Sequence, residues 1–445
     1  MILIKQSKNQ YLTHYIPAAI IALVAPMGYL APLGEWLLIA FLSLTLLLNF
    51  MINPYKLNSY GLILFCAACG LIFFSYFWSI SPARTAEVIL PKTGILFAIL
   101  VAITASSNIK IKNIHIILGI SLMFTAVIIF LDLIFNAEIR SKLSQIAGDE
   151  TTSISGHYSR GLLIMTILLP IVLSALLNKK FFIFATVLFL LASFSILLGP
   201  NSTAKITLLL SIVAAFIIYF LGPKSFFISS IIIIFWIISA PYLMQKAIPP
   251  LLNIEKQIRI VSTCDVQFTT EGKHFEWKNV IGKNNYCETT VSWQHPYHRA
   301  GSSLVHRLLI WEFVAKEVKK NIILGKGIGT SRLIGQNHIL IVPQAEPDIR
   351  GAIPLHPHNN VLQIWLELGA IGAILYAVLW IFILKLGNSL RKKSFILGTG
   401  ACTSIISLFL VSNLSFGVFQ AWWMATMGLV ILSIILTCKN HLDMS

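Results

Sequence analysis

The chain has 445 residues, of which 57% are hydrophobic and only 11% are charged, against roughly 25% charged residues in an average soluble domain. This composition excludes an ordinary soluble enzyme. Apolar runs of the length that crosses a bilayer core, about 20 residues, recur from one end of the sequence to the other. The sequence therefore predicts an all-α polytopic membrane protein.

The apolar runs, taken in chain order, predict twelve transmembrane helices. Because this number is even, both termini are expected on the same side of the membrane. The chain then divides into nine helices in residues 1–243, a large polar connection in residues 244–358, and three helices in residues 359–445. The predicted helices cover residues 15–34, 36–51, 59–77, 88–105, 114–135, 160–177, 181–198, 205–221, 226–243, 360–384, 395–412 and 418–437.

The 33 Lys and Arg residues outnumber the 17 Asp and Glu residues, which gives a formal net charge of +16. Many of these basic residues lie in alternate connections, on the side that carries both termini. Cytoplasmic loops hold an excess of Lys and Arg, so this side is predicted to be cytoplasmic. Orientation in the membrane accounts for most of the excess charge, and no nucleic-acid partner is predicted. The residues concerned are Lys5, Lys8, Lys56, Lys110, Lys112, Lys179, Lys180, Lys224, Lys385, Arg391, Lys392, Lys393 and Lys439.

The connection of residues 244–358 is accordingly expected outside the cytoplasm, together with a smaller polar loop at 136–159. Two of the 6 cysteines, Cys264 and Cys287, lie in the large connection. An oxidising compartment would permit a disulfide between them. Two unpaired thiols are the alternative.

The large connection contains seven of the 11 histidines, but their spacing matches no zinc-binding motif, so no metal site is predicted. A Gly-x-Ser-x-Gly nucleophile elbow is also absent from the sequence. The glycine-rich run 325–329 lacks the Gly-Lys-Ser/Thr ending of a phosphate-binding loop, which favours a simple turn. Hydrolytic, metal-dependent and ATP-dependent chemistry are therefore not indicated.

Apolar residues recur at helical spacing across residues 303–320, which predicts an amphipathic helix at the outer surface of the protein or in the membrane interface. Arg307 lies beside its apolar face and would point toward the protein body, where a lone guanidinium needs an anionic partner. That partner could be a substrate. The alternatives are lipid phosphate and an acidic side chain such as Glu312.

The tenth predicted span opens with a second polar cluster. Asn359, Gln363 and Glu367 recur at intervals of four and form one stripe that lipid would not tolerate, so the stripe must face protein or a water-filled crevice. His358 lies near the first turn, where the helix dipole favours an anion. Gly369 and Gly372 further along are expected to let a neighbouring helix approach closely.

Other cations stand toward the outer ends of the spans: Arg84, Lys92, Arg160 and Lys205. Taken singly, each is explained by snorkelling to the interface. Together with Arg307 and a histidine, they indicate a site for a lipid-linked phosphate.

At residues 303–376 the sequence resembles the O-antigen ligase and O-antigen polymerase superfamily (Wzy_C-type) of inner-membrane glycan transferases, and the ligase most of all. One matching segment is His306-Arg307-Leu308-Leu309-Ile310-Trp311, followed by residues 321–327. The other runs from His358-Asn359-Asn360-Val361-Leu362-Gln363 through Glu367 to Gly372, and is similar to the family's His-Asn-x-x-Leu-Gln-x-x-x-Glu-x-Gly-x-x-Gly pattern.

The resemblance implies a GT-C-like architecture for lipid-linked sugars, in the bacterial inner membrane with a periplasmic active site. The implied donor is an undecaprenyl-pyrophosphate-linked glycan and the implied acceptor a lipid A-core sugar, without cofactor or metal. His358 would be the general base and Arg307 would bind the donor pyrophosphate. Lys205 or Arg160 would replace a second arginine that is usual in the family.

Three other functions remain open at this stage. An O-antigen polymerase and an oligosaccharyltransferase acting on protein hydroxyls would share the donor and differ only in the acceptor. A secondary transporter would also be consistent with twelve spans. Transport coupling generally needs ionisable groups near the bilayer midplane, whereas Asp132, Glu87 and Glu367 lie toward the outer ends of their spans.

Overall fold

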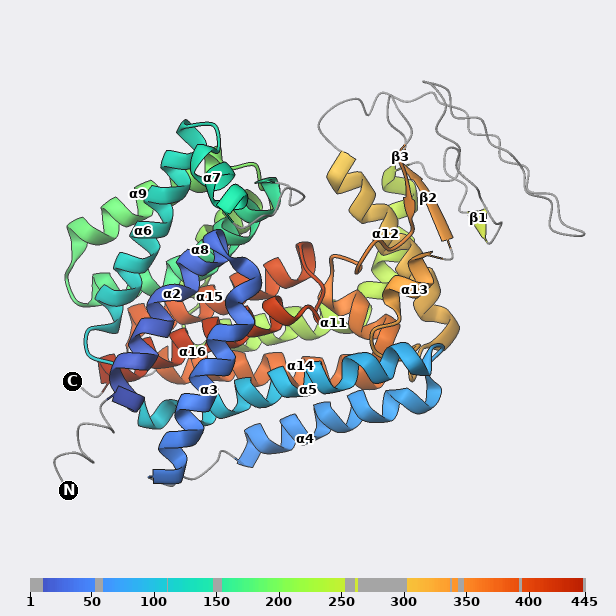
Figure 1. The fold of residues 1–445 in the computed structure, drawn as a ribbon, viewed down its shortest axis with the longest axis horizontal. Coiled ribbons are helices and arrows are strands. Elements are labelled where there is room, and N and C mark those ends of the chain that lie inside the picture. The colour runs from blue at the N-terminus through green and yellow to red at the C-terminus, as the bar shows by residue number, and fades with distance from the viewer. Residues whose placement is uncertain are drawn as a thin grey trace, which may run out of the picture.

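The computed structural model describes residues 11–52, 59–109, 111–146, 154–252, 261–262, 302–336, 338–342, 348–391 and 394–442. Helices make up most of this part of the chain and pack side by side (Figure 1). The short helices and strands at one end of the molecule differ from those at the other end (Figure 1). The helices are α2 (Ile16–Leu30), α3 (Glu35–Ile52), α4 (Ser59–Phe74), α5 (Pro82–Thr104), α6 (Ile114–Ile134), α7 (Glu138–Ile146), α8 (Ile154–Asn178), α9 (Phe182–Leu198), α10 (Ser202–Leu221), α11 (Lys224–Leu252), α12 (Ser302–Val318), α13 (Ser331–Gln336), α14 (Asn360–Arg391), α15 (Phe395–Leu414) and α16 (Ala421–Leu442).

Eleven helical segments in the described residues are long and apolar enough to cross a membrane. The remaining predicted span, residues 181–198, corresponds to α9, a shorter apolar helix that covers Phe182–Leu198. Each predicted span thus coincides with an apolar helix, and the prediction of a helical polytopic membrane protein is confirmed. Several helices extend beyond the predicted limits, and α11 continues to Leu252.

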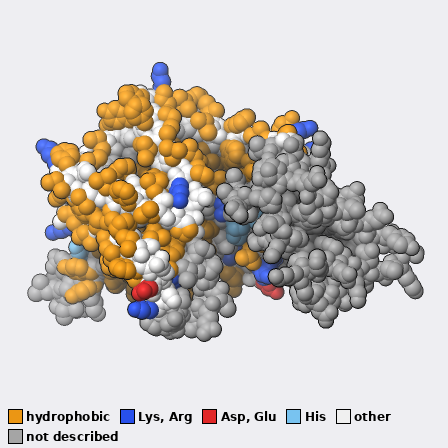
Figure 2. Space-filling model, turned by 90° about the horizontal axis from the view of Figure 1, so that it is seen from above, with side chains coloured by type: hydrophobic (Ala, Val, Ile, Leu, Met, Phe, Trp, Pro, Cys, Tyr) orange, Lys and Arg blue, Asp and Glu red, His pale blue; other side chains and the backbone are white. Residues whose placement is uncertain are grey.

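The surface of the helical body is apolar, as expected of a protein surrounded by lipid. Large hydrophobic side chains on α3, α9, α10 and α11 are exposed, among them Phe41, Phe194, Phe216 and Phe235. In the view of Figure 2, hydrophobic side chains cover most of the described surface and charged ones are few. Helices α8, α15 and α16 lie innermost and supply much of the core, including the fully buried Trp423.

Helix α14 is broken at Gly369, which has φ +64° and ψ −159°. The loop that follows α12 enters this break. The backbone N–H of Lys326 donates to Leu366 O at 2.9 Å, and that of Ala370 donates to Ile322 O at 2.8 Å. A Cβ atom on Gly369 would lie 2.3 Å from Ile323 O, so only glycine fits there. The expectation that a neighbouring helix packs against Gly369 is therefore wrong, because the segment that approaches is a loop.

Helix α12 packs between α11 and α14, and its middle part is buried on all sides. Leu309, Ile310, Phe313, Val314 and Ala315 are all at most 3% exposed. The predicted helix is therefore present, but the prediction of an amphipathic helix with one buried face, at the outer surface of the protein or in the membrane interface, is wrong in that more than one face is buried. The burial of α12 carries Arg307, near its first turns, into the protein.

The structure also contains a small antiparallel sheet that the sequence patterns did not indicate. Strand β2 (His338–Val342) pairs with β1 (Val261–Ser262) on one side and with β3 (Asp348–Gly351) on the other. Together with α12 and α13, strands β2 and β3 lie at the end of the molecule away from α6, α7 and α9 (Figure 1). All three strands belong to the connection of residues 244–358.

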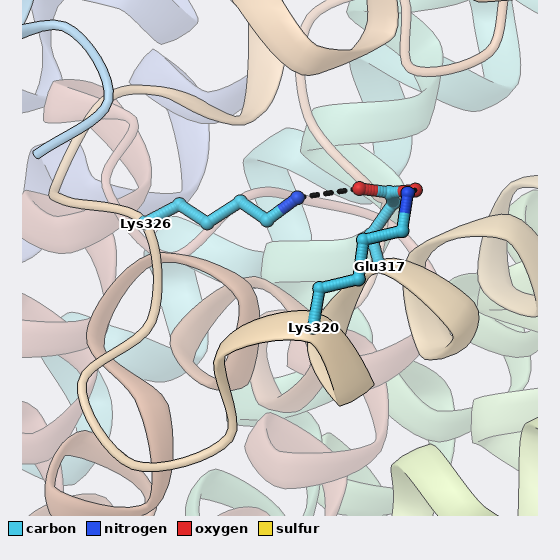
Figure 3. Close-up of polar contacts among 3 residues, drawn as sticks. All are labelled: Glu317, Lys320 and Lys326. Carbon is cyan, nitrogen blue, oxygen red and sulfur yellow. Dashed lines mark hydrogen bonds and ion pairs between the residues drawn. The ribbon is translucent and has the colours of Figure 1, made fainter. Parts of the chain in front are cut away.

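A buried ion pair fixes the loop after α12. Glu317 on α12 contacts the ammonium groups of both Lys320 and Lys326 (Figure 3). Burial raises the pKa of the Glu317 carboxyl, but the hydrogen bonds and positive charges of Lys320 and Lys326 outweigh this effect and hold the pKa below its usual value. The Lys326 side chain is only 9% exposed, whereas that of Lys320 is 62% exposed.

We expect Glu317→Gln to lower the free energy of unfolding by about 3–5 kcal/mol, because it leaves the buried ammonium of Lys326 without a counter-charge. Lys320→Met is the matched control. It removes an exposed partner of the same carboxylate and should cost at most about 1 kcal/mol. Thermal unfolding of the purified protein in detergent measures both effects. Equal shifts for the two variants would contradict the assignment of the buried pair as the stabilising one.

Candidate functional site

The connection between α15 and α16, residues 415–420, brings the two principal predicted site residues together. The guanidinium of Arg307 donates through Nη1 to Leu414 O at 2.7 Å. The imidazole of His358 lies with Nδ1 2.7 Å from the next carbonyl oxygen, Ser415 O. Two residues that are 51 positions apart in the sequence are thus held by consecutive backbone carbonyls.

The contact with Ser415 determines which nitrogen of His358 can act as a base. A carbonyl oxygen only accepts hydrogen bonds, so Nδ1 must carry the proton and donate it. In the neutral imidazole, Nε2 then holds the free lone pair. Burial lowers the pKa of His358 to about 4; the hydrogen bond to Ser415 opposes this shift, and the positive charge of Arg307 adds to it. His358 is therefore neutral at physiological pH and able to accept a proton.

Arg307 is placed by α12 and by the start of α10. Asn201 caps α10 by accepting a hydrogen bond from Ala204 N at 2.8 Å. This cap sets Thr203 in the first turn, where its hydroxyl accepts from Arg307 Nη1 at 3.0 Å. Burial lowers the pKa of the Arg307 guanidinium, which is the expected result for a cation whose charge is poorly compensated.

The described residues supply no acidic partner for Arg307. Glu312, the acidic residue considered from the sequence, forms an ion pair with Lys316 instead. In the described residues, the acceptors recorded for Arg307 are one hydroxyl and one carbonyl, both bound by Nη1. A half-buried guanidinium in these surroundings is suited to bind an anion from outside the chain.

The predicted polar stripe faces protein and not water. Asn359 caps α14 by accepting from Leu362 N at 3.0 Å. Gln363 donates to Glu367 Oε1 at 3.0 Å and accepts from Val418 N at 3.0 Å. Glu367 in turn accepts from the backbone N–H of Gly329 at 2.7 Å. Gln363 and Glu367 therefore connect the segment after α12 with the α15–α16 connection, next to which His358 and Arg307 lie.

The other predicted cations occupy separate positions. Arg160 on α8 stacks over the ring of Trp422 at 5.0 Å, and Trp422 packs against Phe416 at 4.6 Å. Arg160 thus borders the 415–420 connection. Lys205 lies on α10, two residues beyond Thr203. Cys264 and Cys287, the predicted disulfide pair, lie outside the described residues.

Two buried polar atoms beside the site have no hydrogen-bond partner within the described ranges. They are Asn359 Nδ2 and Ser415 Oγ. Buried polar groups are normally paired, so unused hydrogen-bonding capacity next to His358 is consistent with a place for a polar ligand such as a sugar hydroxyl.

The acidic residues that a transporter would need for coupling are engaged in fixed contacts. Asp132 accepts hydrogen bonds from Tyr158 at 2.7 Å and from the backbone of Ile139 at 2.8 Å. Glu367 binds backbone N–H groups, as described above, and Glu87 pairs with Arg84 at 2.6 Å at the surface. These contacts favour structural roles for the three carboxylates.

Sequence reasoning missed the contribution of the 415–420 connection. Its functional groups are backbone carbonyls, which give no residue-specific signal. Gly417 was a possible hint, since a Cβ atom there would lie 2.7 Å from His356 and from Gln363. A second feature that the sequence patterns did not indicate is the proximity of His356 to His358: both precede α14 in a turn, and their ring centroids lie 4.3 Å apart.

Fold and site together define a multi-pass membrane protein in which a neutral histidine and a half-buried arginine meet at the end of the transmembrane bundle. Comparison with known families agrees with this class. Residues 187–377 match the family described as O-antigen ligase. The resemblance drawn from the two motifs is confirmed, and the matched part of the chain runs from α9 into α14.

Individual relatives point the same way. Proteins of Rickettsia felis, Rickettsia conorii and Rickettsia prowazekii, all named as candidate polysaccharide ligases, are respectively 36%, 38% and 36% identical to this chain over 124, 128 and 127 residues. The matches cover 27–28% of this chain and 29–30% of each relative. The chain thus matches less than a third of the length of these relatives.

Proposed function

We propose that this protein is an O-antigen ligase that transfers a glycan from undecaprenyl pyrophosphate to a sugar hydroxyl of the lipid A-core. The observation that carries the proposal is the convergence of His358 and Arg307 on consecutive carbonyls, Ser415 O and Leu414 O. The match to the O-antigen ligase family favours a ligase over the polymerase and the protein oligosaccharyltransferase.

The chemistry of such a transfer needs one base and one cation. The acceptor hydroxyl attacks the anomeric carbon of the donor sugar, a new C–O bond forms, and the bond to the pyrophosphate oxygen breaks. His358 Nε2 takes the hydroxyl proton, which activates the nucleophile. Arg307 stabilises the negative charge that develops on the departing pyrophosphate. Neither step calls for a metal ion or a nucleotide.

The remaining cations extend the proposed donor site. Arg160 and Lys205 are proposed to face the pyrophosphate or its lipid surroundings. Arg160 is the better placed, because its stacking on Trp422 holds it next to the 415–420 connection. Lys205 would offer a single point charge in place of the planar fork of an arginine.

The charge distribution supports a definite orientation for the proposed enzyme. With the Lys-rich connections in the cytoplasm, both termini are cytoplasmic and the ends of α14 and α10 that carry the site face the periplasm. The protein then lies in the inner membrane, where its lipid-linked donor and its acceptor are both embedded in the outer leaflet.

Deletion of the gene tests the proposal against its nearest rivals. Loss of a ligase leaves long lipid-linked glycan that is not attached to the core. Loss of a polymerase leaves single repeat units on the core, and loss of a protein oligosaccharyltransferase leaves lipopolysaccharide unchanged. Either of the last two phenotypes would overturn the assignment as a ligase.

We expect kcat/KM for glycan transfer to stay nearly constant as the pH falls from about 8 to about 5.5, since the pKa of His358 is lowered to about 4. Below that pKa, protonation removes the lone pair on Nε2 and the rate falls. Bound pyrophosphate adds negative charge near His358 and raises its pKa, so kcat should fall at a higher pH than kcat/KM. Initial rates across a pH series, with the unfolding temperature as a control, measure this. A midpoint of kcat/KM near the ordinary histidine value of about 6.5 would contradict it.

A further inference from the structure

The peptide segment that precedes α14 is held in an unusual conformation at His358. This residue has φ +55°, in the left-handed region that residues other than glycine rarely adopt. Such a backbone conformation is strained and persists only where surrounding contacts enforce it. From this conformation the His358 side chain reaches Ser415 O, with Nδ1 at 2.7 Å.

The backbone of His358 is contacted by the side chain of His356. The backbone N–H of His358 donates to Nδ1 of His356 at 3.1 Å. A side-chain acceptor that binds the backbone N–H two residues further on is the arrangement of an Asx turn, which asparagine and aspartate usually form. The imidazole of His356 therefore takes the role that an asparagine side chain usually has in such a turn, here around Pro357.

The turn is also fixed from both flanks. Trp311 on α12 donates through Nε1 to Pro357 O at 2.8 Å. On the other side, Gly417 lies so close to the His356 ring that a Cβ atom there would come within 2.7 Å of it. His356 itself is only 6% exposed. The imidazole of His356 thus sits in a fitted position between α12 and the 415–420 connection.

The hydrogen bond also sets the tautomer of His356. Because Nδ1 accepts, the proton of the neutral ring must lie on Nε2. Burial holds the pKa of His356 well below its ordinary value, and the positive charge of Arg307 lowers it further, so the ring stays neutral. His356 and His358 therefore carry their protons on opposite nitrogens.

We propose that His356 is a positioning residue, which acts as an Asx-type acceptor that holds the backbone of His358 in the left-handed conformation and so directs its imidazole to Ser415 O. This inference rests on the proposed function for its effect on the rate, but not for the geometry itself. His356 does not exchange protons with the substrate in this account.

Three substitutions at position 356 separate this role from others. In His356→Asn, the carboxamide oxygen replaces Nδ1 and restores the turn. In His356→Gln, the added methylene moves the amide away, and His356→Ala has no acceptor. We expect the Asn variant to keep kcat for glycan transfer within about threefold of wild type. The Gln and Ala variants should lose about tenfold in kcat, the equivalent of one hydrogen bond of roughly 1.4 kcal/mol, with KM for the donor unchanged.

An Asn variant as impaired as the Ala variant, beside an active wild type, would overturn the positioning role and indicate that His356 takes part in proton transfer. A readout independent of activity uses ¹⁵N-histidine NMR of the full-length protein, with His356 assigned by substitution. We expect an unprotonated Nδ1 and a protonated Nε2 at His356, and the reverse at His358. The opposite tautomer at His356 would exclude the turn even if no glycan were transferred, whereas an inactive wild type with the expected tautomers would count against the proposed function alone.

Discussion

His358→Ala should reduce the rate of glycan transfer by about 10²–10⁴-fold, the usual contribution of a positioned general base. The imidazole donates to Ser415 O through Nδ1 and presents Nε2 as the only free lone pair of the ring. Alanine removes this base but leaves Arg307 and its contacts in place. The measurement is the initial rate of transfer from a lipid-linked donor to a lipid A-core acceptor by purified protein in liposomes.

His115→Ala is a suitable control for the loss of a buried histidine. His115 on α6 is 5% exposed and packs against Phe181, away from every residue of the proposed site. We expect this variant to transfer glycan within a few-fold of wild type. Comparable losses in the two variants would mean that the His358 effect reflects general damage to the fold.

Arg307→Ala should lower kcat/KM by about 10²–10³-fold, the loss typical of removing one preorganised group that stabilises developing negative charge. The residue is half-buried and has no acidic partner in the described part of the chain, so its charge is available to the leaving pyrophosphate. Arg307→Lys should fall between wild type and alanine. A lysine keeps the charge, but a single ammonium cannot serve Leu414 O, Thr203 and an anion with the geometry of a guanidinium.

Arg84→Ala controls for the loss of a cation at the outer end of a span. Arg84 lies at the surface and pairs with Glu87 at 2.6 Å, a type of contact worth at most about 1 kcal/mol. Its removal should leave both the rate and the affinity for the donor unchanged. An Arg307→Ala variant that is as active as Arg84→Ala would remove Arg307 from the mechanism.

The helical plan could be predicted because it depends on residue type alone. Long apolar runs must be helical in a bilayer, and each of the twelve runs found in the sequence corresponds to an apolar helix in the structure. The helix of residues 303–320 shows the limit of this reasoning. Its pattern suggested one buried face, but α11 and α14 cover it on more than one side, and a pattern cannot report how many neighbours a helix has.

The difference between residue type and tertiary contacts also explains which parts of the site could be predicted. His358, Arg307 and the stripe of Asn359, Gln363 and Glu367 could be selected because charged and polar side chains are costly in such surroundings. The structural role of Glu367 could not be predicted, since it accepts hydrogen bonds from backbone N–H groups that follow the loop in the break at Gly369. The turn formed by His356 was equally hidden, because histidine is not a usual residue for it.

Donor binding and single-turnover transfer, measured in the same proteoliposomes, test the central claim that a histidine base and an arginine cation act on one lipid-linked pyrophosphate. With a labelled undecaprenyl-pyrophosphate glycan, and with chelator present and nucleotide absent, wild-type protein should bind the donor and transfer it once the acceptor is added. His358→Ala should bind the donor with nearly unchanged affinity and transfer almost none of it, while Arg307→Ala should lose affinity as well. Transfer by His358→Ala at the wild-type rate would contradict the account.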